Sequence, residues 1–301
     1  MPSTIFIDAT PDHLPLWRQV HRDSDPAIAI NMVPVAADQV PAILDGYDTC
    51  IVDATYFPRD QLERCRGLRH IVFLGTGAAS YIDLAAAKDH GIKVSTISGY
   101  GDTTVAEHAI GLMFAAARQT AKMDRSMRAG TWIPSQGMQL FGKTLGVVGL
   151  GGIGREMARL GRGIGMDVLA WNRTAIADPP VPLVDIDELL QRADVVSLHL
   201  SLNDATRGFM NRARLGRMKP DAILINTARG AIVDRAALVE CLVSGRIRHA
   251  GIDVFEPEPP RSGDPLVALE NVTLTAHAGF FTPEATMVML RRSIDLAAAG
   301  F

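Results

Sequence analysis

Arginine, histidine and carboxylate side chains follow apolar segments in the last part of the chain. Arg229 follows one such segment, His277 follows another, and the stretch between them, DVFEPEPP, carries Asp253, Glu256 and Glu258. An arginine can hold a carboxylate through two parallel hydrogen bonds, and a histidine can give a proton to a carbonyl oxygen. A carboxylate beside the imidazole orients it and favours its charged form. Each residue could also be purely structural, but together they suit hydride transfer to a keto acid.

Apolar strands that alternate with helical segments would position these side chains. Near-continuous apolar strands separated by helices are typical of parallel sheets covered on both faces, so two sets of strands predict two doubly wound α/β domains. The strands are expected at 4–9, 27–33, 49–54, 70–75 and 92–96, and then at 144–150, 166–172, 194–200, 222–228, 249–255 and 271–277. A long helix is expected at 103–130, and a last one has Thr282 as its N-cap and Pro283 as its first residue. The carboxyl ends of parallel strands face the ligand crevice of an open sheet, so the arginine, carboxylate and histidine should lie near one another.

The segment TLGVVGLGGIGREMARL has the glycine spacing of a dinucleotide-binding turn. Gly149, Gly151 and Gly154 form G-x-G-x-x-G directly after an apolar strand and at the start of a helix. The first glycine permits the tight turn, the second lets the backbone approach a pyrophosphate, and the third lets the helix pack close to the strand. The helix N-terminus offers free amides and partial positive charge to the phosphates. The sequence therefore predicts a dinucleotide site.

The end of the following strand, WNRT, indicates which dinucleotide is preferred. An acidic residue here would accept hydrogen bonds from the ribose 2'-hydroxyl and repel a 2'-phosphate, but this chain has Asn172, Arg173 and Thr174. A guanidinium can pair with the phosphate and stack on the adenine, while the two neighbours offer neutral hydrogen bonds. The alternative is an exposed arginine in a turn. We predict NADP(H) as the preferred cofactor, with NAD(H) as the second candidate.

Composition excludes several classes of function. Of the 301 residues, 48% are hydrophobic and 21% are charged, and the net charge of -3 gives no attraction to nucleic acid or an anionic membrane. No apolar run is long enough for a membrane helix, and the N-terminus does not have the pattern of a signal peptide. Cys50, Cys65 and Cys241 have neither disulfide nor metal spacing. We therefore expect a cytoplasmic protein without a bound metal.

Taken together, these segments resemble the D-isomer-specific 2-hydroxyacid dehydrogenase family over nearly the whole chain. The segments that carry the resemblance run in the order of the family: GTGAASYID (75–83), GIKVST (91–96), VAEHAIGLMFAAAR (105–118), RAGTW (128–132), GKTLGVVGLGGIG (142–154), SLHL (197–200), NTARGAIVD (226–234), DVFEPEP (253–259) and HAGFFTPEA (277–285). The resemblance places the catalytic arginine, glutamate and histidine of the family on Arg229, Glu258 and His277. Glu256 is not the match by position.

The resemblance also implies an architecture. It implies a flavodoxin-like substrate domain, 1–98 with 283–301, and an inserted Rossmann domain, 99–282. Backbone amides of Gly77 and Ala78 would bind the substrate carboxylate, where small side chains let an anion approach the backbone. A homodimer would form through the Rossmann domain and the helix near 103–120.

Reduction of a small 2-keto acid, glyoxylate or hydroxypyruvate, by NADPH is the function that we expect. WNRT is similar to a segment found in NADPH-dependent reductases of these two acids. Two alternatives stay open: an NAD(P)-sensing, corepressor-like binding protein, and a dehydrogenase of another small anion such as phosphite. The residues expected to contact the cofactor are Thr104, Gly149, Gly151, Gly152, Ile153, Gly154, Asn172, Arg173, Thr174, His199, Leu200, Ser201, Thr206, Thr227, Ala228, Arg229, Asp253, His277 and Gly279.

Overall fold

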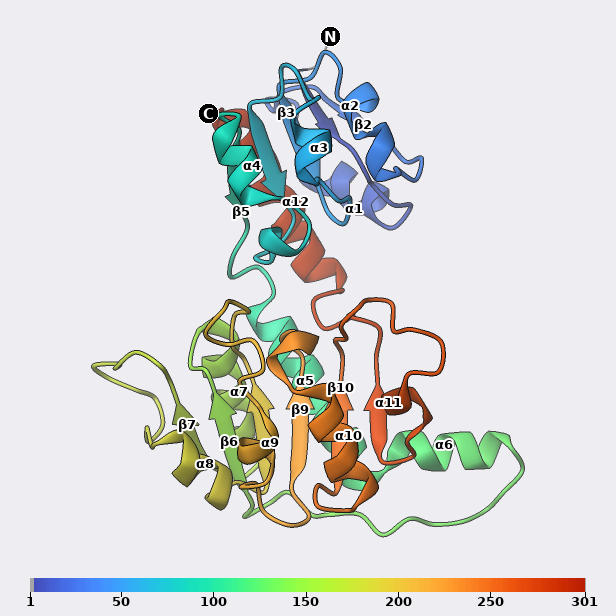
Figure 1. Ribbon diagram of the computed structural model, residues 1–301, viewed down its shortest axis with the longest axis vertical. Helices are drawn as coiled ribbons and strands as arrows, with labels where there is room; N and C mark the ends of the chain where they lie inside the picture. The colour runs from blue at the N-terminus through green and yellow to red at the C-terminus, as the bar shows by residue number, and fades with distance from the viewer. Residues whose placement is uncertain (1–2, 301) are drawn as a thin grey trace. The chain divides into compact units, whose positions relative to one another are not determined.

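A computed structural model describes residues 3–300 of the chain. The chain divides into two compact units (Figure 1), one formed by Met1–Tyr100 with Phe281–Phe301 and the other by Gly101–Phe280. Each unit is built on one parallel sheet with helices on both faces. The predicted class, two doubly wound parallel-sheet α/β units, is confirmed.

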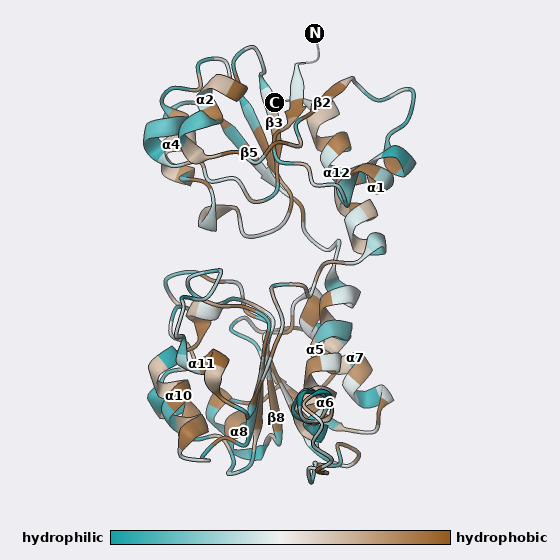
Figure 2. Cartoon of the chain, turned by 90° about the vertical axis from the view of Figure 1, so that its right-hand side faces the viewer, coloured by the Kyte–Doolittle hydropathy of each residue, from teal (hydrophilic) through white to brown (hydrophobic). Residues whose placement is uncertain are grey.

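The sheet of the first unit has five strands in the order β2-β1-β3-β4-β5, all parallel. This is the strand order of flavodoxin-like folds. Its strands are β1 (Thr4–Phe6), β2 (Ile28–Ile30), β3 (Thr49–Val52), β4 (His70–Phe73) and β5 (Lys93–Thr96). Helices α1 (His13–Val20) and α12 (Pro283–Ala299) pack together on one face. The other face carries α2 (Val40–Ile43) and α4 (Leu84–Asp89), as Figure 2 shows, and α3 (Arg59–Leu62) contacts both of these helices.

The last helix, α12, brings the end of the chain back to the first unit. The Oγ1 of Thr282 accepts a hydrogen bond from the amide of Ala285 at 3.3 Å, and Pro283 occupies the first turn, where no amide is needed. Leu290 and Ile294 are fully buried against the sheet. Arg291 donates to the carbonyl oxygen of Val20, the last residue of α1, and to Asp25 in the segment that follows α1. The predicted helix start is therefore correct.

The sheet of the second unit has six strands in the order β11-β10-β9-β8-β6-β7, all parallel. They are β6 (Thr144–Val148), β7 (Asp167–Trp171), β8 (Val195–Leu198), β9 (Ile223–Asn226), β10 (His249–Ile252) and β11 (Val272–Leu274). A parallel bridge between Ala170 and Leu183 extends the sheet beyond β7. Leu183 therefore stands where the third strand of the Rossmann order would lie.

Helices cover both faces of this second sheet and enclose two hydrophobic cores. They are α5 (Asp102–Arg118), α6 (Thr120–Arg128), α7 (Gly152–Gly163), α8 (Ile186–Arg192), α9 (Arg212–Leu215), α10 (Arg235–Val243) and α11 (Pro265–Ala268). Figure 2 shows the sheet edge-on, with α5 and α7 on one face and α8, α10 and α11 on the other. Met113 and Met157 are fully buried in one core, and Leu189 and Leu190 are fully buried in the other. The strands between them are almost entirely buried, as the apolar segments predicted.

The helix predicted at 103–130 is two helices, so this expectation was wrong. Gln119 has a left-handed backbone conformation, with φ of 52°, and separates α5 from α6. The amide of Met138 donates to the carbonyl oxygen of Ala117 at 2.7 Å, and the side chain of Gln119 donates to Gln136 at 3.0 Å. The segment around Met138 thus donates a hydrogen bond to a carbonyl group in the last turn of α5, and the helix ends there.

No helix among residues 3–300 is both long and apolar enough to cross a membrane. Within the same residues, no cluster of three histidine, cysteine or acidic side chains could hold a metal ion.

Candidate active site

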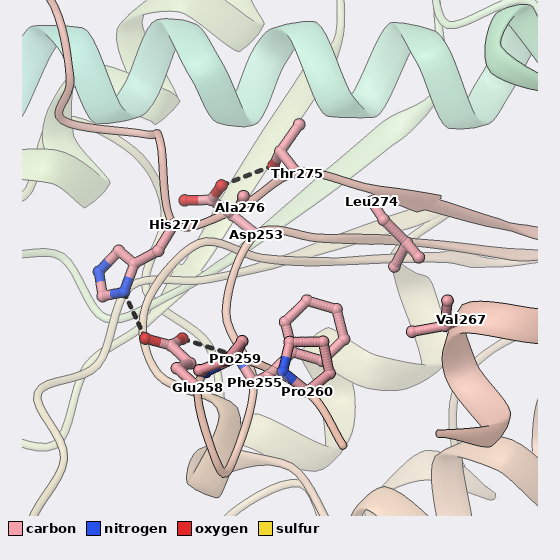
Figure 3. A pocket seen from close by; sticks show the side chains of 10 residues that line it. All are labelled: Asp253, Phe255, Glu258, Pro259, Pro260, Val267, Leu274, Thr275, Ala276 and His277. Atoms are coloured by element: carbon pink, nitrogen blue, oxygen red, sulfur yellow. Dashed lines mark hydrogen bonds and ion pairs between the residues drawn. The ribbon is translucent and has the colours of Figure 1, made fainter. Parts of the chain in front are cut away.

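A histidine and a glutamate form a close pair just beyond the carboxyl ends of β10 and β11. The Nδ1 of His277 lies 2.7 Å from the Oε2 of Glu258. The other oxygen of this carboxylate, Oε1, accepts a hydrogen bond from the amide of Phe255 at 2.8 Å. Figure 3 shows the second ring nitrogen of His277 turned away from Glu258. One nitrogen is thus occupied by a carboxylate, and the other is available to a ligand.

The surroundings of Glu258 favour its ionised form. Partial burial raises the pKa of the carboxyl group, but the hydrogen bonds from His277 and the amide of Phe255 lower it, as does the charge of Arg229. The net effect is a pKa below the ordinary value for glutamate. About a third of each side chain of the pair is exposed. The carboxylate is therefore charged at neutral pH and can only accept the hydrogen bond that orients the imidazole.

Arg229 is held in a polar turn that follows β9. The side chain of Asn226 donates to the carbonyl oxygen of Arg229 at 3.0 Å and accepts from the amide of Ala228 at 3.1 Å. The next residue must be small, because a Cβ on Gly230 would lie 2.3 Å from the backbone of Phe255. This close approach brings the turn that carries Arg229 against the loop that carries Glu258.

Asp253 is buried beneath His277, and its carboxylate accepts several hydrogen bonds. Its side chain, 1% exposed, accepts hydrogen bonds from the Oγ1 of Thr275 at 2.6 Å and from the amides of Ala278 at 2.9 Å and Gly279 at 3.0 Å. Its own carbonyl oxygen accepts from the amide of His277 at 2.7 Å. Burial raises the pKa of this carboxyl group, yet the hydrogen bonds to it outweigh burial and lower the pKa to about 2. Asp253 was expected to contact the cofactor; its side chain binds the protein.

The glycine turn has the shape that close approach of a ligand requires. Gly149 has φ of 97°, and a Cβ there would lie 2.6 Å from the carbonyl oxygen of His199. A Cβ on Gly154 would lie 1.9 Å from the carbonyl oxygen of Gly149, so the start of α7 packs directly on the turn. A Cβ on Gly151, in contrast, would meet nothing within 4 Å, so the backbone is open at this point. The three glycines thus have the three different surroundings that a pyrophosphate-binding turn needs.

Asn172 supports this turn from the end of β7. Its Oδ1 accepts from the amide of Leu150 at 3.0 Å, and its Nδ2 donates to the carbonyl oxygen of Thr174 at 2.8 Å. Both ends of the amide are therefore used within the protein. Arg173 and the side chain of Thr174 are exposed beside it. The sequence did not suggest this structural role for Asn172.

The other residues expected at the cofactor site lie around the same edge of the sheet. Thr227, after β9, is only 8% exposed. Its Oγ1 has no hydrogen-bond partner among residues 3–300. A buried hydroxyl without a partner fits a site that a ligand completes. Burial lowers the pKa of His199 to about 4, so its ring is neutral at neutral pH. The hydroxyl of Thr206 binds the carbonyl oxygen of Ser201 at 2.7 Å.

The remaining members of that set lie on four segments. Thr104 is in the first turn of α5, Gly152 and Ile153 begin α7, and Leu200 and Ala228 follow β8 and β9. A Cβ on Gly152 would lie 1.9 Å from the carboxylate of Asp102, so the side chain of Asp102 would have to move if this residue were larger.

Gly77 and Ala78 belong to the first unit, whereas Arg229, Glu258 and His277 belong to the second. Gly77 precedes a single 3-10 turn, Ala78–Ser80, and Ala78 is buried. Neither amide donates a hydrogen bond to another residue of the 3–300 segment. Two neighbouring amides without partners are suited to hold an anion.

A cavity of about 490 Å³ lies beside the His277–Glu258 pair. Its wall is mainly apolar, and Figure 3 shows Phe255, Pro260 and Val267 on the side opposite the second ring nitrogen of His277. The cavity therefore lies behind the pair, and not in front of the nitrogen that is available to a ligand.

Known proteins are similar to this chain in both sequence and fold. Residues 110–279 match the family model described as "D-isomer specific 2-hydroxyacid dehydrogenase, NAD binding domain". The hydroxypyruvate reductase of Thermotoga maritima is 40% identical over 82% of this chain and 83% of its own length. The glycerate dehydrogenase of Methylorubrum extorquens is 35% identical over 86% of this chain and 84% of its own.

Solved structures have the same fold over nearly the whole chain. The TT0316 protein of Thermus thermophilus is 32% identical, with a TM-score of 0.85 over 98% of this chain and 96% of that one. An acyclic imino acid reductase in complex with NADPH and D-Arg is 29% identical, with a TM-score of 0.86 over 98% and 97%. The chain therefore belongs to the D-isomer-specific 2-hydroxyacid dehydrogenase family and is an oxidoreductase with an NAD-binding domain.

Proposed function

We propose that this protein reduces a small 2-keto acid, glyoxylate or hydroxypyruvate, to the D-2-hydroxy acid with NADPH. The observation that carries the proposal is the His277–Glu258 pair beside Arg229, at the ligand edge of a Rossmann sheet. Relatives named hydroxypyruvate reductase and glyoxylate reductase support the substrate class. We assign the first unit as the substrate domain.

Each residue of the site has one task in this reaction. Arg229 would hold the substrate carboxylate. The free amides of Gly77 and Ala78, in the first unit, are suited to bind an anion of the same kind. When bound, NADPH supplies the hydride that reduces the carbonyl carbon. His277 gives the proton on its outer nitrogen to the carbonyl oxygen, and Glu258 keeps the ring charged and oriented.

The chain's own residues also account for cofactor binding. The open backbone at Gly151 and the start of α7 would hold the pyrophosphate. The unpartnered hydroxyl of Thr227 would bind the cofactor near the reacting end. Arg173, exposed beside the turn that Asn172 braces, would pair with the 2'-phosphate. The NADPH complex of a related reductase supports this cofactor.

Replacing Arg173 with alanine should remove the preference for NADPH. We expect KM for NADPH to rise about 10- to 100-fold, which corresponds to about 1.4 to 2.7 kcal/mol for a charge-assisted contact, and KM for NADH to change little. The measurement is steady-state reduction of glyoxylate, hydroxypyruvate and pyruvate with each cofactor. Arg159→Ala is the matched control, because Arg159 is an exposed arginine on α7 that pairs with Glu156.

Two results would change the proposal in different ways. Preference for NADH in the unmodified enzyme would show that the WNRT segment does not bind a 2'-phosphate. The proposal that the enzyme reduces a keto acid would be unaffected. Tight cofactor binding without turnover of any keto acid would favour the sensor, or a dehydrogenase of another anion such as phosphite.

We also propose a homodimer. Large apolar side chains are exposed along the segment that begins in α6 and leads to β6, with Trp132 82% exposed, Phe141 70% and Ile133 64%. Several exposed apolar side chains on one segment are typical of an interface. Trp132→Ser with Ile133→Ser should shift the mass measured by light scattering from dimer to monomer. A monomer in the unmodified protein would contradict the proposal.

A further inference from the structure

A second histidine contacts a carboxylate behind His277, and the proposed reaction does not use it. His108, on α5, places its Nε2 2.9 Å from the Oγ1 of Thr275 and 3.3 Å from the Oδ1 of Asp253. The side chain of His108 is 23% exposed, and that of Asp253 is 1% exposed. The contact joins α5 to the two loops that follow β10 and β11.

The direction of the hydrogen bonds follows from the number of protons. Asp253 is ionised, so its carboxylate can only accept. Thr275 has one hydroxyl proton, and the short 2.6 Å distance to Asp253 shows where that proton points. The Nε2 of His108 must therefore carry a proton and donate it to Thr275. The chain of donors runs from His108 through Thr275 to Asp253.

The end of this chain determines where His277 lies. Asp253 binds the amides of three successive residues, His277 through its backbone carbonyl and Ala278 and Gly279 through its carboxylate. His277 has φ of 52°, a conformation that residues other than glycine rarely adopt. Such a conformation persists only where the surrounding contacts hold it. The contacts to Asp253 supply that restraint.

The ring of His108 also closes the space beneath this turn. A Cβ on Gly279 would lie 3.0 Å from the Oδ2 of Asp253 and 3.5 Å from the Cδ2 of His108. A Cβ on Gly101 would lie 3.7 Å from the Cβ of Phe280. Residues near the start of the second unit thus lie close to its last residues at two places.

We propose that His108 is a positioning residue for His277, acting through the donor chain to Thr275 and Asp253. The proposal rests on the proposed function, in which His277 is the proton donor. His108 touches neither the substrate nor the reacting atoms. Its contribution is to keep the turn at 277–279 in the geometry that presents the outer nitrogen of His277.

Two substitutions at His108 separate the hydrogen bond from the packing. His108→Leu fills space but removes the donor, whereas His108→Gln keeps an N–H group that can reach Thr275. We expect His108→Leu to lower kcat about 10- to 100-fold, the cost of a small misplacement of a catalytic group, with KM for the keto acid and Kd for NADPH within twofold. His108→Gln should restore most of kcat.

A second readout does not depend on turnover. Amide hydrogen exchange of the peptide that spans 275–280 should become faster in His108→Leu and stay slow in His108→Gln, because the hydrogen bonds to Asp253 protect those amides. Thr275→Val removes the middle of the donor chain without touching α5 and should reproduce both effects of His108→Leu. It serves as the test if the leucine variant does not fold.

A matched control comes from a similar pair elsewhere in the sheet. His249 and Thr273 are also buried and lie 2.9 Å apart, but they are joined to neither Asp253 nor His277. His249→Leu should lower the melting temperature and leave kcat and the exchange of 275–280 unchanged.

The outcomes distinguish the two proposals. Unchanged kcat and unchanged exchange in His108→Leu would overturn the role of His108, as would a glutamine variant that behaves like the leucine variant. If the unmodified protein reduced no keto acid, the proposed function would fail, and the exchange data would still decide whether His108 holds the turn.

Discussion

Replacing His277 with glutamine is expected to lower kcat for keto acid reduction by about three orders of magnitude, within the range measured for loss of a general acid. Glutamine can still donate a hydrogen bond to Glu258, so the loop should keep its geometry, but it has no proton to transfer. Cofactor binding should be nearly unchanged. Steady-state rates with glyoxylate and a fluorescence titration with NADPH measure the two effects.

The pH dependence tests the same assignment. The reduction rate of the unmodified enzyme should fall as pH rises, because the imidazole loses the proton that it must donate. Glu258 adds no change near neutrality, since its pKa lies below the ordinary glutamate value. Glu258→Gln should lower the rate, because the charged carboxylate that orients the ring is gone. A His277→Gln enzyme whose rate followed the wild-type profile would exclude His277 as the proton donor.

Asp253→Asn is expected to lower the free energy of unfolding at pH 7 by at least about 2 kcal/mol, the equivalent of a pKa shift of nearly two units. The carboxylate is buried and accepts from Thr275 and two backbone amides. An asparagine has only one acceptor atom and would turn a donor toward one of those groups. Urea denaturation of both proteins, followed by circular dichroism, gives the difference.

The sign of the pH dependence follows from the lowered pKa. The folded-state pKa of Asp253 is about 2, below the unfolded value of about 4. Its contribution to stability is therefore complete above the unfolded pKa and is lost as pH falls toward the folded pKa. The gap between the two proteins should narrow from pH 5 to pH 2. A gap that stayed constant over this range would contradict an ionised Asp253.

A surface carboxylate is the control for this measurement. Asp124 is ion-paired with Arg128 on an exposed face of α6. Exposed pairs contribute little to stability because water and salt screen them. Asp124→Asn should therefore unfold at the same urea concentration as the unmodified protein at every pH.

Local features of the chain determined the strands, the glycine turn and the start of α12. The apolar segments formed buried parallel strands because burial on both faces leaves a continuous hydrophobic pattern in the sequence. The positive φ of Gly149 and the contact of Gly154 with the carbonyl oxygen of Gly149 both arise within one strand, its turn and the next helix. Thr282 and Pro283 mark a helix start for equally local reasons.

The sequence also predicted which residues follow the carboxyl ends of the strands, although each strand is shorter than its apolar segment. Arg229, Glu258 and His277 follow β9, β10 and β11, which are neighbours in the sheet, and parallel strands put their carboxyl ends at one edge. The residues at that edge could therefore be grouped before any distance was known. Their family assignment then followed from the motifs around them.

Only the tertiary structure decided which partner each polar group has. The break at Gln119 depends on a segment that returns to Ala117, and the side-chain oxygen of Asn172 accepts a hydrogen bond from the backbone amide of Leu150 across the turn. His108 meets Thr275 across 167 positions of sequence. Hydrogen bonds over such separations depend on how helices and strands pack, and a buried polar group takes whichever partner that packing provides. The sequence alone determined the elements and the chemistry at their ends, and the packing determined what holds His277 in place.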